Sequence, residues 1–111
     1  MAKSIILTQN DSGIELNVQF LDDKKDPVYI VGSSIEIQFI TPSDVLMPVE
    51  YGQITDGVNG EVSFVLGEEH TAEEGLYKTY WKVIDANSEI TAQSEVYYYV
   101  KALYGGVGGE S

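Results

Sequence analysis

The segment GLYKTYWKVIDANSEITAQSEVYYYVK, residues 75–101, decides the fold. Its first half alternates between two sets of side chains with a period of two, which is typical of a strand with one buried face. One predicted face holds Tyr77, Thr79, Trp81 and Val83, and the other holds Lys78, Tyr80 and Lys82. Residues 85–88, Asp-Ala-Asn-Ser, have the composition of a hairpin turn. Residues 90–101 alternate again, so the segment predicts two long antiparallel strands.

The same period of two recurs on the N-terminal side of this hairpin. It is found in residues 14–20, 35–39 and 62–66. Acidic, proline-containing runs at residues 22–27 and 41–44 separate these strands, because such residues favour turns. Three further strands are therefore expected.

The remaining segments are less regular. Residues 45–52 contain Pro48, which cannot donate to a ladder, so they indicate an edge strand or an irregular crossing. Residues 54–60 are rich in residues that tolerate a positive φ and predict a turn. Residues 67–74 are the helix candidate, about two turns at most, and Gly75 ends it.

About seven strands with almost no helix predict an all-β fold, an antiparallel β-sandwich. An immunoglobulin-like topology is the first choice, although the Cys-Trp-Cys pattern of antibody domains is missing, and a small barrel is the second. A chain of 111 residues has the size of one domain. We expect a single sandwich over residues 1–104 and a Gly-rich flexible tail over residues 105–111.

The charge balance excludes several partners. Six Lys and Arg face 18 Asp and Glu, which gives a formal net charge of −12. Such a surface repels phosphate backbones and anionic lipids, so we expect no nucleic acid and no membrane partner. The N-terminal apolar segment is too short for a secretory signal. Without cysteine there is no disulfide or thiolate metal site, which leaves the redox compartment open.

Residues that carry catalytic or metal chemistry are scarce. His70 is the single histidine and lies among Glu68, Glu69, Glu73 and Glu74, which predicts a solvated acidic loop rather than a catalytic centre. Adjacent glutamates in a polar loop do not provide the separated acid and base of a glycosidase. Two acidic groups, Asp22-Asp23-Asp26 and Asp56-Asn59-Glu61, do not match a calcium-loop spacing. We therefore expect no enzyme, no metal and no cofactor.

The tyrosines are the strongest candidates for a binding site. If Tyr98 is buried, Tyr97 and Tyr99 share the opposite face of their strand, with Tyr80 on the neighbouring strand. Exposed aromatic rows serve protein interfaces and also stack on sugar rings, whereas ordinary cross-strand packing is the structural alternative. Tyr80, Tyr97 and Tyr99 are the predicted interface residues.

The order of the elements resembles a known family. The stretches GIELNVQFLDDKKDPVYIVGSSIEIQFITP (residues 13–42), ITDGVNGEVSFVL (54–66), AEEGLYKTYWKVID (72–85) and EVYYYV (95–100) carry the resemblance. They are similar to the N-terminal immunoglobulin-like domain of the baseplate upper proteins of tailed phages, and to related small virion proteins, over roughly residues 5–101. Baseplate members of that family continue into helical linkers and a trimerising region, whereas here a Gly-rich tail follows. The resemblance implies a free-standing module, and a head, neck or tail accessory protein fits as well as a baseplate one.

The resemblance implies a non-enzymatic structural protein of a phage particle, located in the virion. Its expected partners are other virion structural proteins and, as a homo-oligomer, itself. The alternative is a carbohydrate-binding or adhesin module that stacks the same tyrosines on a glycan.

Overall fold

The hairpin expected from residues 75–101 forms the centre of the larger of two sheets. Strand β7 (Gly75–Ile84) pairs antiparallel with β8 (Ile90–Lys101) over nearly its whole length. The connecting turn is closed by Asp85, whose carboxylate accepts hydrogen bonds from the backbone N–H groups of Asn87 and Glu89. Ser88 has a φ of 64°. The predicted hairpin and its turn are therefore confirmed.

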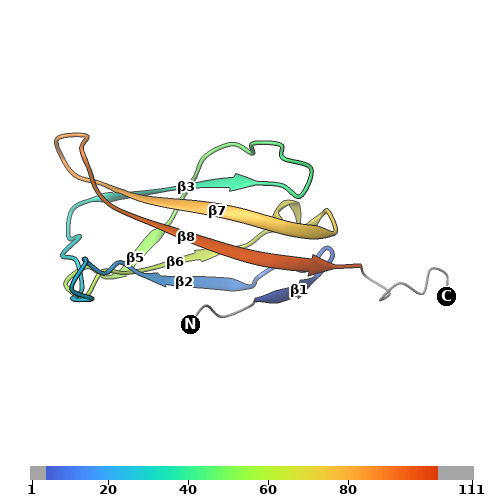
Figure 1. Ribbon diagram of the computed structural model, residues 1–111, viewed down its shortest axis with the longest axis horizontal. Helices are drawn as coiled ribbons and strands as arrows, with labels where there is room; N and C mark the ends of the chain where they lie inside the picture. The colour runs from blue at the N-terminus through green and yellow to red at the C-terminus, as the bar shows by residue number, and fades with distance from the viewer. Residues whose placement is uncertain (1–4, 103–111) are drawn as a thin grey trace.

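The structure is a computed structural model that describes residues 5–102, and its two sheets pack face to face (Figure 1). The larger sheet has the strand order β1-β8-β7-β3-β4, and β1 runs parallel to β8. The smaller sheet has the order β2-β6-β5 and is antiparallel. The other strands are β1 (Ile6–Thr8), β2 (Glu15–Gln19), β3 (Ser34–Ile40), β4 (Glu50–Tyr51), β5 (Gln53–Asp56) and β6 (Glu61–Val65).

This arrangement is an immunoglobulin-like sandwich rather than a small barrel. Strands β2, β6 and β5 take the places of B, E and D, while β8, β7, β3 and β4 take those of G, F, C and C′. A tyrosine corner is also present where the chain enters β7. There the hydroxyl of Tyr77 accepts a 3.1 Å hydrogen bond from the backbone N–H of Glu73, four residues upstream. The predicted fold class is confirmed.

Two details differ from the sequence-based expectations. Residues 53–56 form β5, where a turn was expected, because Ile54 pairs with Val62 on β6 and the reversal is confined to the residues after Asp56. The helix candidate is only a single 3₁₀ turn, η1 (Glu68–Thr71). None of the helices in the described residues is long and apolar enough to cross a membrane.

The core lies between the sheets and is rich in aromatic side chains. Its largest fully buried members are Trp81, Tyr77, Tyr98, Phe20 and Phe39. Trp81 donates a 2.7 Å hydrogen bond from Nε1 to the hydroxyl of Thr79, which itself donates to the carbonyl of Val96 at 2.7 Å. Thr79 is the second residue after the corner tyrosine, the place of a disulfide cysteine in antibody domains. In this protein, Thr79 and its hydrogen bond with Trp81 take the position of that cysteine.

The expected single domain over residues 1–104 stays a prediction. Its C-terminal boundary and the Gly-rich tail of residues 105–111 lie outside the described residues.

Candidate binding face and the buried histidine

The outward face of the larger sheet carries the three tyrosines expected from the sequence. Tyr80 belongs to β7, whereas Tyr97 and Tyr99 belong to β8, and all three alternate with buried or partly buried neighbours. The register places Tyr80 opposite Glu95 and Tyr97 opposite Lys78. Tyr97 and Tyr99 are 44% and 43% exposed, and Tyr80 is partly buried. The structure brings the three together on one surface, and their role in binding stays a prediction.

Tyr97 is held in place by a neighbouring carboxylate. Its hydroxyl donates a 2.8 Å hydrogen bond to Oε1 of Glu95. This bond, with smaller contributions from desolvation, the Glu95 charge and the Tyr80 hydroxyl, raises the pKa of Tyr97 to about 12. The phenol is therefore neutral at physiological pH. A neutral ring fixed at its hydroxyl suits packing or stacking rather than proton transfer.

Two apolar side chains extend the tyrosine row. On β7, Leu76 lies opposite Tyr99, and on the other side Ile6 of β1 lies opposite the same tyrosine. Both are exposed. We call Ile6, Leu76, Tyr80, Tyr97 and Tyr99 the tyrosine face. Leu76 could have been found from the period of two in β7, whereas Ile6 could not, because nothing local shows that β1 pairs with β8.

The tyrosine face is free of the acidic excess found elsewhere. Among the outward positions of β1, β3, β7 and β8, the charged side chains are three lysines and two glutamates: Lys78, Lys82, Lys101, Glu36 and Glu95. The chain as a whole carries a formal charge of −12. A partner approaching this face therefore meets little of the repulsion that the rest of the surface presents to another acidic molecule.

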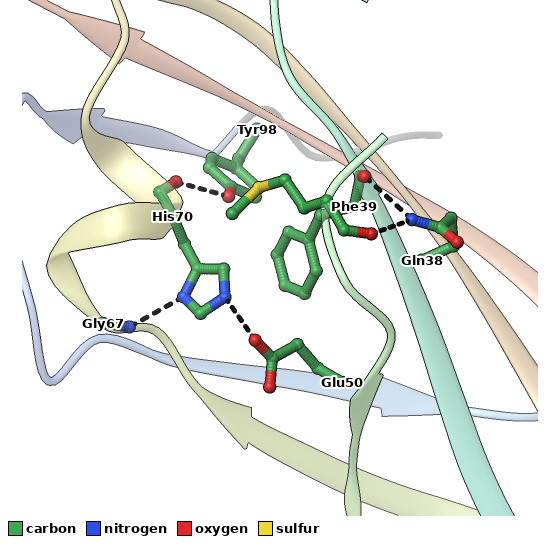
Figure 2. Close-up of polar contacts among 7 residues, drawn as sticks. Gln38, Phe39, Glu50, Gly67, His70 and Tyr98 are labelled. Atoms are coloured by element: carbon green, nitrogen blue, oxygen red, sulfur yellow. Dashed lines mark hydrogen bonds and ion pairs between the residues drawn. The ribbon is translucent and has the colours of Figure 1, made fainter. Parts of the chain in front are cut away.

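His70 is buried, so the expectation of a solvated loop histidine was wrong. Only 2% of the residue is exposed. Its ring packs against Phe39, with centroids 4.5 Å apart, and edge-on against Phe64 at 5.3 Å. Its backbone carbonyl accepts a 2.6 Å hydrogen bond from the hydroxyl of Tyr98 (Figure 2). The 3₁₀ turn places the ring in the interior, and the glutamate-rich sequence around His70 gives no sign of this burial.

The ring of His70 is engaged at both nitrogens. Nδ1 accepts a 2.9 Å hydrogen bond from the backbone N–H of Gly67, which fixes the proton on Nε2 in the neutral ring. Nε2 lies 3.3 Å from Oε2 of Glu50, to which it donates (Figure 2). Glu50 points inward because it pairs with Ile37, a buried residue of β3, in the register of β3 and β4. Through its hydrogen bond to Glu50, His70 connects η1, which precedes β7, to strand β4.

A group of possible metal ligands occurs at this point. One ligand atom each of Glu50, Glu69 and His70 lies within 4.8 Å of the others. A metal ion needs a free lone pair on imidazole nitrogen, but Nδ1 accepts from Gly67 and Nε2 carries the proton. The hydrogen bonds therefore favour a structural role for this group.

In the two aspartate-containing loops, the aspartate side chains accept hydrogen bonds from backbone N–H groups of the same loop. Asp22 accepts hydrogen bonds from the N–H groups of Lys24 and Asp26. Asp56 accepts from the side-chain amide and the N–H of Asn59, and these bonds lower the pKa of Asp56. Such bonds are what aspartate commonly provides in turns.

The chain shares its fold with a domain of a phage protein. The N-terminal domain of phage TP901-1 ORF48 matches with a TM-score of 0.69 at 14% identity, over 89% of this chain and 85% of that one. The Ig1 domain of mouse SynCAM 2 matches with a TM-score of 0.38 at 10% identity, over 90% of each chain, and at that score no inference follows. No family model and no curated protein matches the sequence.

Proposed function

We propose that this protein is a non-enzymatic structural subunit of a phage virion, an accessory of the baseplate, tail, neck or head. It docks on another virion subunit through the tyrosine face. The observation that carries the proposal is the composition of that face, where three tyrosines, Ile6 and Leu76 are grouped on a surface without excess acidic charge. The fold shared with a domain of a phage protein supports the virion setting.

A protein partner suits this face better than a glycan. Protein interfaces are enriched in tyrosine and have apolar centres. Sugar recognition needs hydrogen-bonding groups beside the stacking ring, whereas Tyr99 has Leu76 and Ile6 on either side. The hydroxyl of Tyr97 is already donated to Glu95.

The test is incorporation into phage particles. Gradient-purified virions carrying the wild-type chain are compared by quantitative mass spectrometry with virions carrying the double variant Tyr97→Ser/Tyr99→Ser. We expect wild type at a fixed copy number and a loss of about tenfold or more for the double variant, since truncating central aromatic anchors costs about 2 kcal/mol or more. Tyr29→Ser is the matched control, because Tyr29 is exposed but lies outside the tyrosine face. Circular dichroism verifies that each variant is folded.

Two results would overturn the proposal. The first is absence of the wild-type chain from purified virions. The second is saturable binding of purified protein to host cell-wall polysaccharide that the double variant loses and Tyr29→Ser keeps, measured by tyrosine and tryptophan fluorescence. That second result would assign the tyrosine face to a glycan.

A further inference from the structure

Within residues 5–102, most of the far edge of β8 has no neighbouring strand. On that side β1 pairs only with Tyr99, Val100 and Lys101, and the N–H of Tyr99 donates to the carbonyl of Ile5 at 2.9 Å. Backbone groups alternate in direction along a strand, so those of Gln93, Glu95 and Tyr97 point to the same side as those of Tyr99. Within residues 5–102, no backbone group of the chain bonds to them there.

This edge lacks the features that usually protect a sheet edge. Natural edges are short, bulged, or carry lysine or proline. The other edge strands of the described residues are shorter: β4 has two residues, β1 three, β5 four with a register shift, and β2 five. Residues 92–98 of β8, in contrast, are regular, contain no proline and hold one charged side chain, Glu95.

We propose that this edge pairs with the same edge of a second copy of the chain, antiparallel about a twofold axis at Ser94. The two larger sheets then form one continuous sheet with both tyrosine faces on the same side. The proposal concerns the edge of β8 rather than the tyrosine face, and it does not depend on a role in a virion.

The sequence of β8 is complementary to itself in this register. Gln93 of one copy lies opposite Glu95 of the other, a pair that forms amide–carboxylate hydrogen bonds, and Ala92 lies opposite Val96. A twofold axis at Glu95 would place two carboxylates face to face, and one at Gln93 would require Thr91, which lies at the register shift between Val83 and Ile84. An axis at Val96 or Tyr97 would bring Tyr99 into the new ladder, although its N–H already donates to Ile5. The register at Ser94 uses the regular part of both strands without this conflict and without repulsion between like charges.

A depression lies beside the middle of β8. A shallow depression of about 360 Å³ is lined by Tyr80, Trp81, Gln93, Ser94 and Glu95. Ser94 is partly buried on the inward side of β8, opposite Trp81. The depression therefore lies over the β7–β8 pair, at the level of the proposed twofold axis.

Charge variants at Gln93 test the register. Analytical ultracentrifugation measures the dimer dissociation constant of the full chain at about 0.15 M and about 1 M salt, where the Debye length falls from about 8 Å to about 3 Å. We expect wild type to dimerise more tightly at high salt, because each copy carries a charge of −12. At the lower salt, Gln93→Glu weakens the dimer about tenfold and Gln93→Lys tightens it by about threefold or more, since Glu95 of the second copy lies opposite in two symmetric pairs.

Thr91→Glu and Thr91→Lys are the matched controls for overall charge. They make the same charge changes on the same face of β8, but position 91 does not face Glu95 of the second copy. Equal effects at positions 91 and 93 would overturn the proposed register. A wild-type chain that stays monomeric at millimolar concentration in high salt would overturn the dimer itself.

A cysteine at the twofold axis gives an independent test. The chain contains no cysteine, so Ser94→Cys introduces a single thiol that faces its own copy across a close, non-hydrogen-bonded pair. Under mild oxidation we expect a disulfide-linked dimer to form at least tenfold faster than for Ser88→Cys in the hairpin turn. Equal rates for the two variants would contradict the twofold axis at Ser94.

Discussion

Gly60 lies where two backbone segments leave no space for a side chain. Its φ is 70°, and an added Cβ would stand 2.8 Å from the carbonyl oxygens of both Phe20 and Val28. Its own carbonyl accepts the N–H of Phe20 at 2.9 Å. This glycine therefore fastens the turn before β6 to the chain that leaves β2.

Gly60→Ala should lower the free energy of unfolding by about 3 kcal/mol, because both the backbone conformation and the close approach disfavour a Cβ. Gly13→Ala is the control: its φ is 76°, but nothing lies within 4 Å of the added Cβ, so we expect a loss of about 1 kcal/mol. Urea denaturation measures both values. Equal losses would show that the contacts at Gly60 do not matter.

Thr79 is the acceptor that allows Trp81 to be fully buried. Thr79→Val keeps the shape but leaves the indole N–H without its 2.7 Å partner, and we expect it to cost about 1–3 kcal/mol of unfolding free energy. Thr79→Ser retains the hydroxyl and loses one methyl group, with an expected cost of about 1 kcal/mol. Thermal unfolding compares them, and a Thr79→Val protein as stable as wild type would contradict the role of this bond.

At the scale of elements, two stacked tyrosines stabilise residues 67–74, the segment that connects β6 of the smaller sheet to β7 of the larger sheet. Tyr77 on β7 and Tyr98 on β8 lie parallel with ring centroids 5.0 Å apart. Tyr77 accepts from the N–H of Glu73, and Tyr98 donates to the carbonyl of His70. Both strands of the hairpin are thereby bonded to residues 67–74, the segment that carries η1.

Tyr98→Phe removes the bond to His70 and leaves a buried carbonyl without that partner. We expect a loss of about 1–3 kcal/mol and faster amide hydrogen exchange confined to residues 67–74. Tyr97→Phe, the neighbouring substitution on the outward face, loses only an exposed hydrogen bond to Glu95 and should leave that exchange unchanged. Hydrogen-exchange mass spectrometry distinguishes the two variants. Unchanged protection of residues 67–74 in Tyr98→Phe would contradict the role of the Tyr98 hydroxyl in holding this segment.

At the scale of the whole molecule, the buried Tyr77 and Tyr98 predict that the free energy of unfolding falls at high pH. Burial raises the pKa of Tyr98 well above its usual range, and burial raises the pKa of Tyr77 as well. A raised pKa in the folded state means that the unfolded chain loses protons first, from about pH 10. The contribution of these two tyrosines to the free energy of unfolding is therefore fully present below about pH 10 and is lost as the pH rises above that value.

The measurement is the free energy of unfolding between pH 8 and pH 12. We expect a constant value up to about pH 10 and a steep fall above it. Tyr98→Phe should be less stable at pH 8 but should show a shallower fall, because one titrating group is gone. A stability that does not change up to pH 12 would contradict the prediction.

How much could be predicted from the sequence differs between local and distant features. The period of two predicted β2, β3, β6, β7 and β8 and the direction of every tyrosine on the hairpin, because side-chain direction in a strand depends only on position. It missed β5, where three or four residues do not establish a period. It also misplaced His70, whose glutamate neighbours suggested solvent.

The amino-acid sequence by itself determined the fold class, the central hairpin and the grouping of Tyr80 with Tyr97 and Tyr99, because alternation and turn composition act over a few residues. The tertiary structure alone decided that, among residues 5–102, β1 pairs with just the end of β8 and no other strand pairs with the rest of that edge. It also decided that Glu50 reaches His70. Those contacts join residues far apart in the chain. They depend on which strands become neighbours when the two sheets close over a shared core, and no local pattern specifies that.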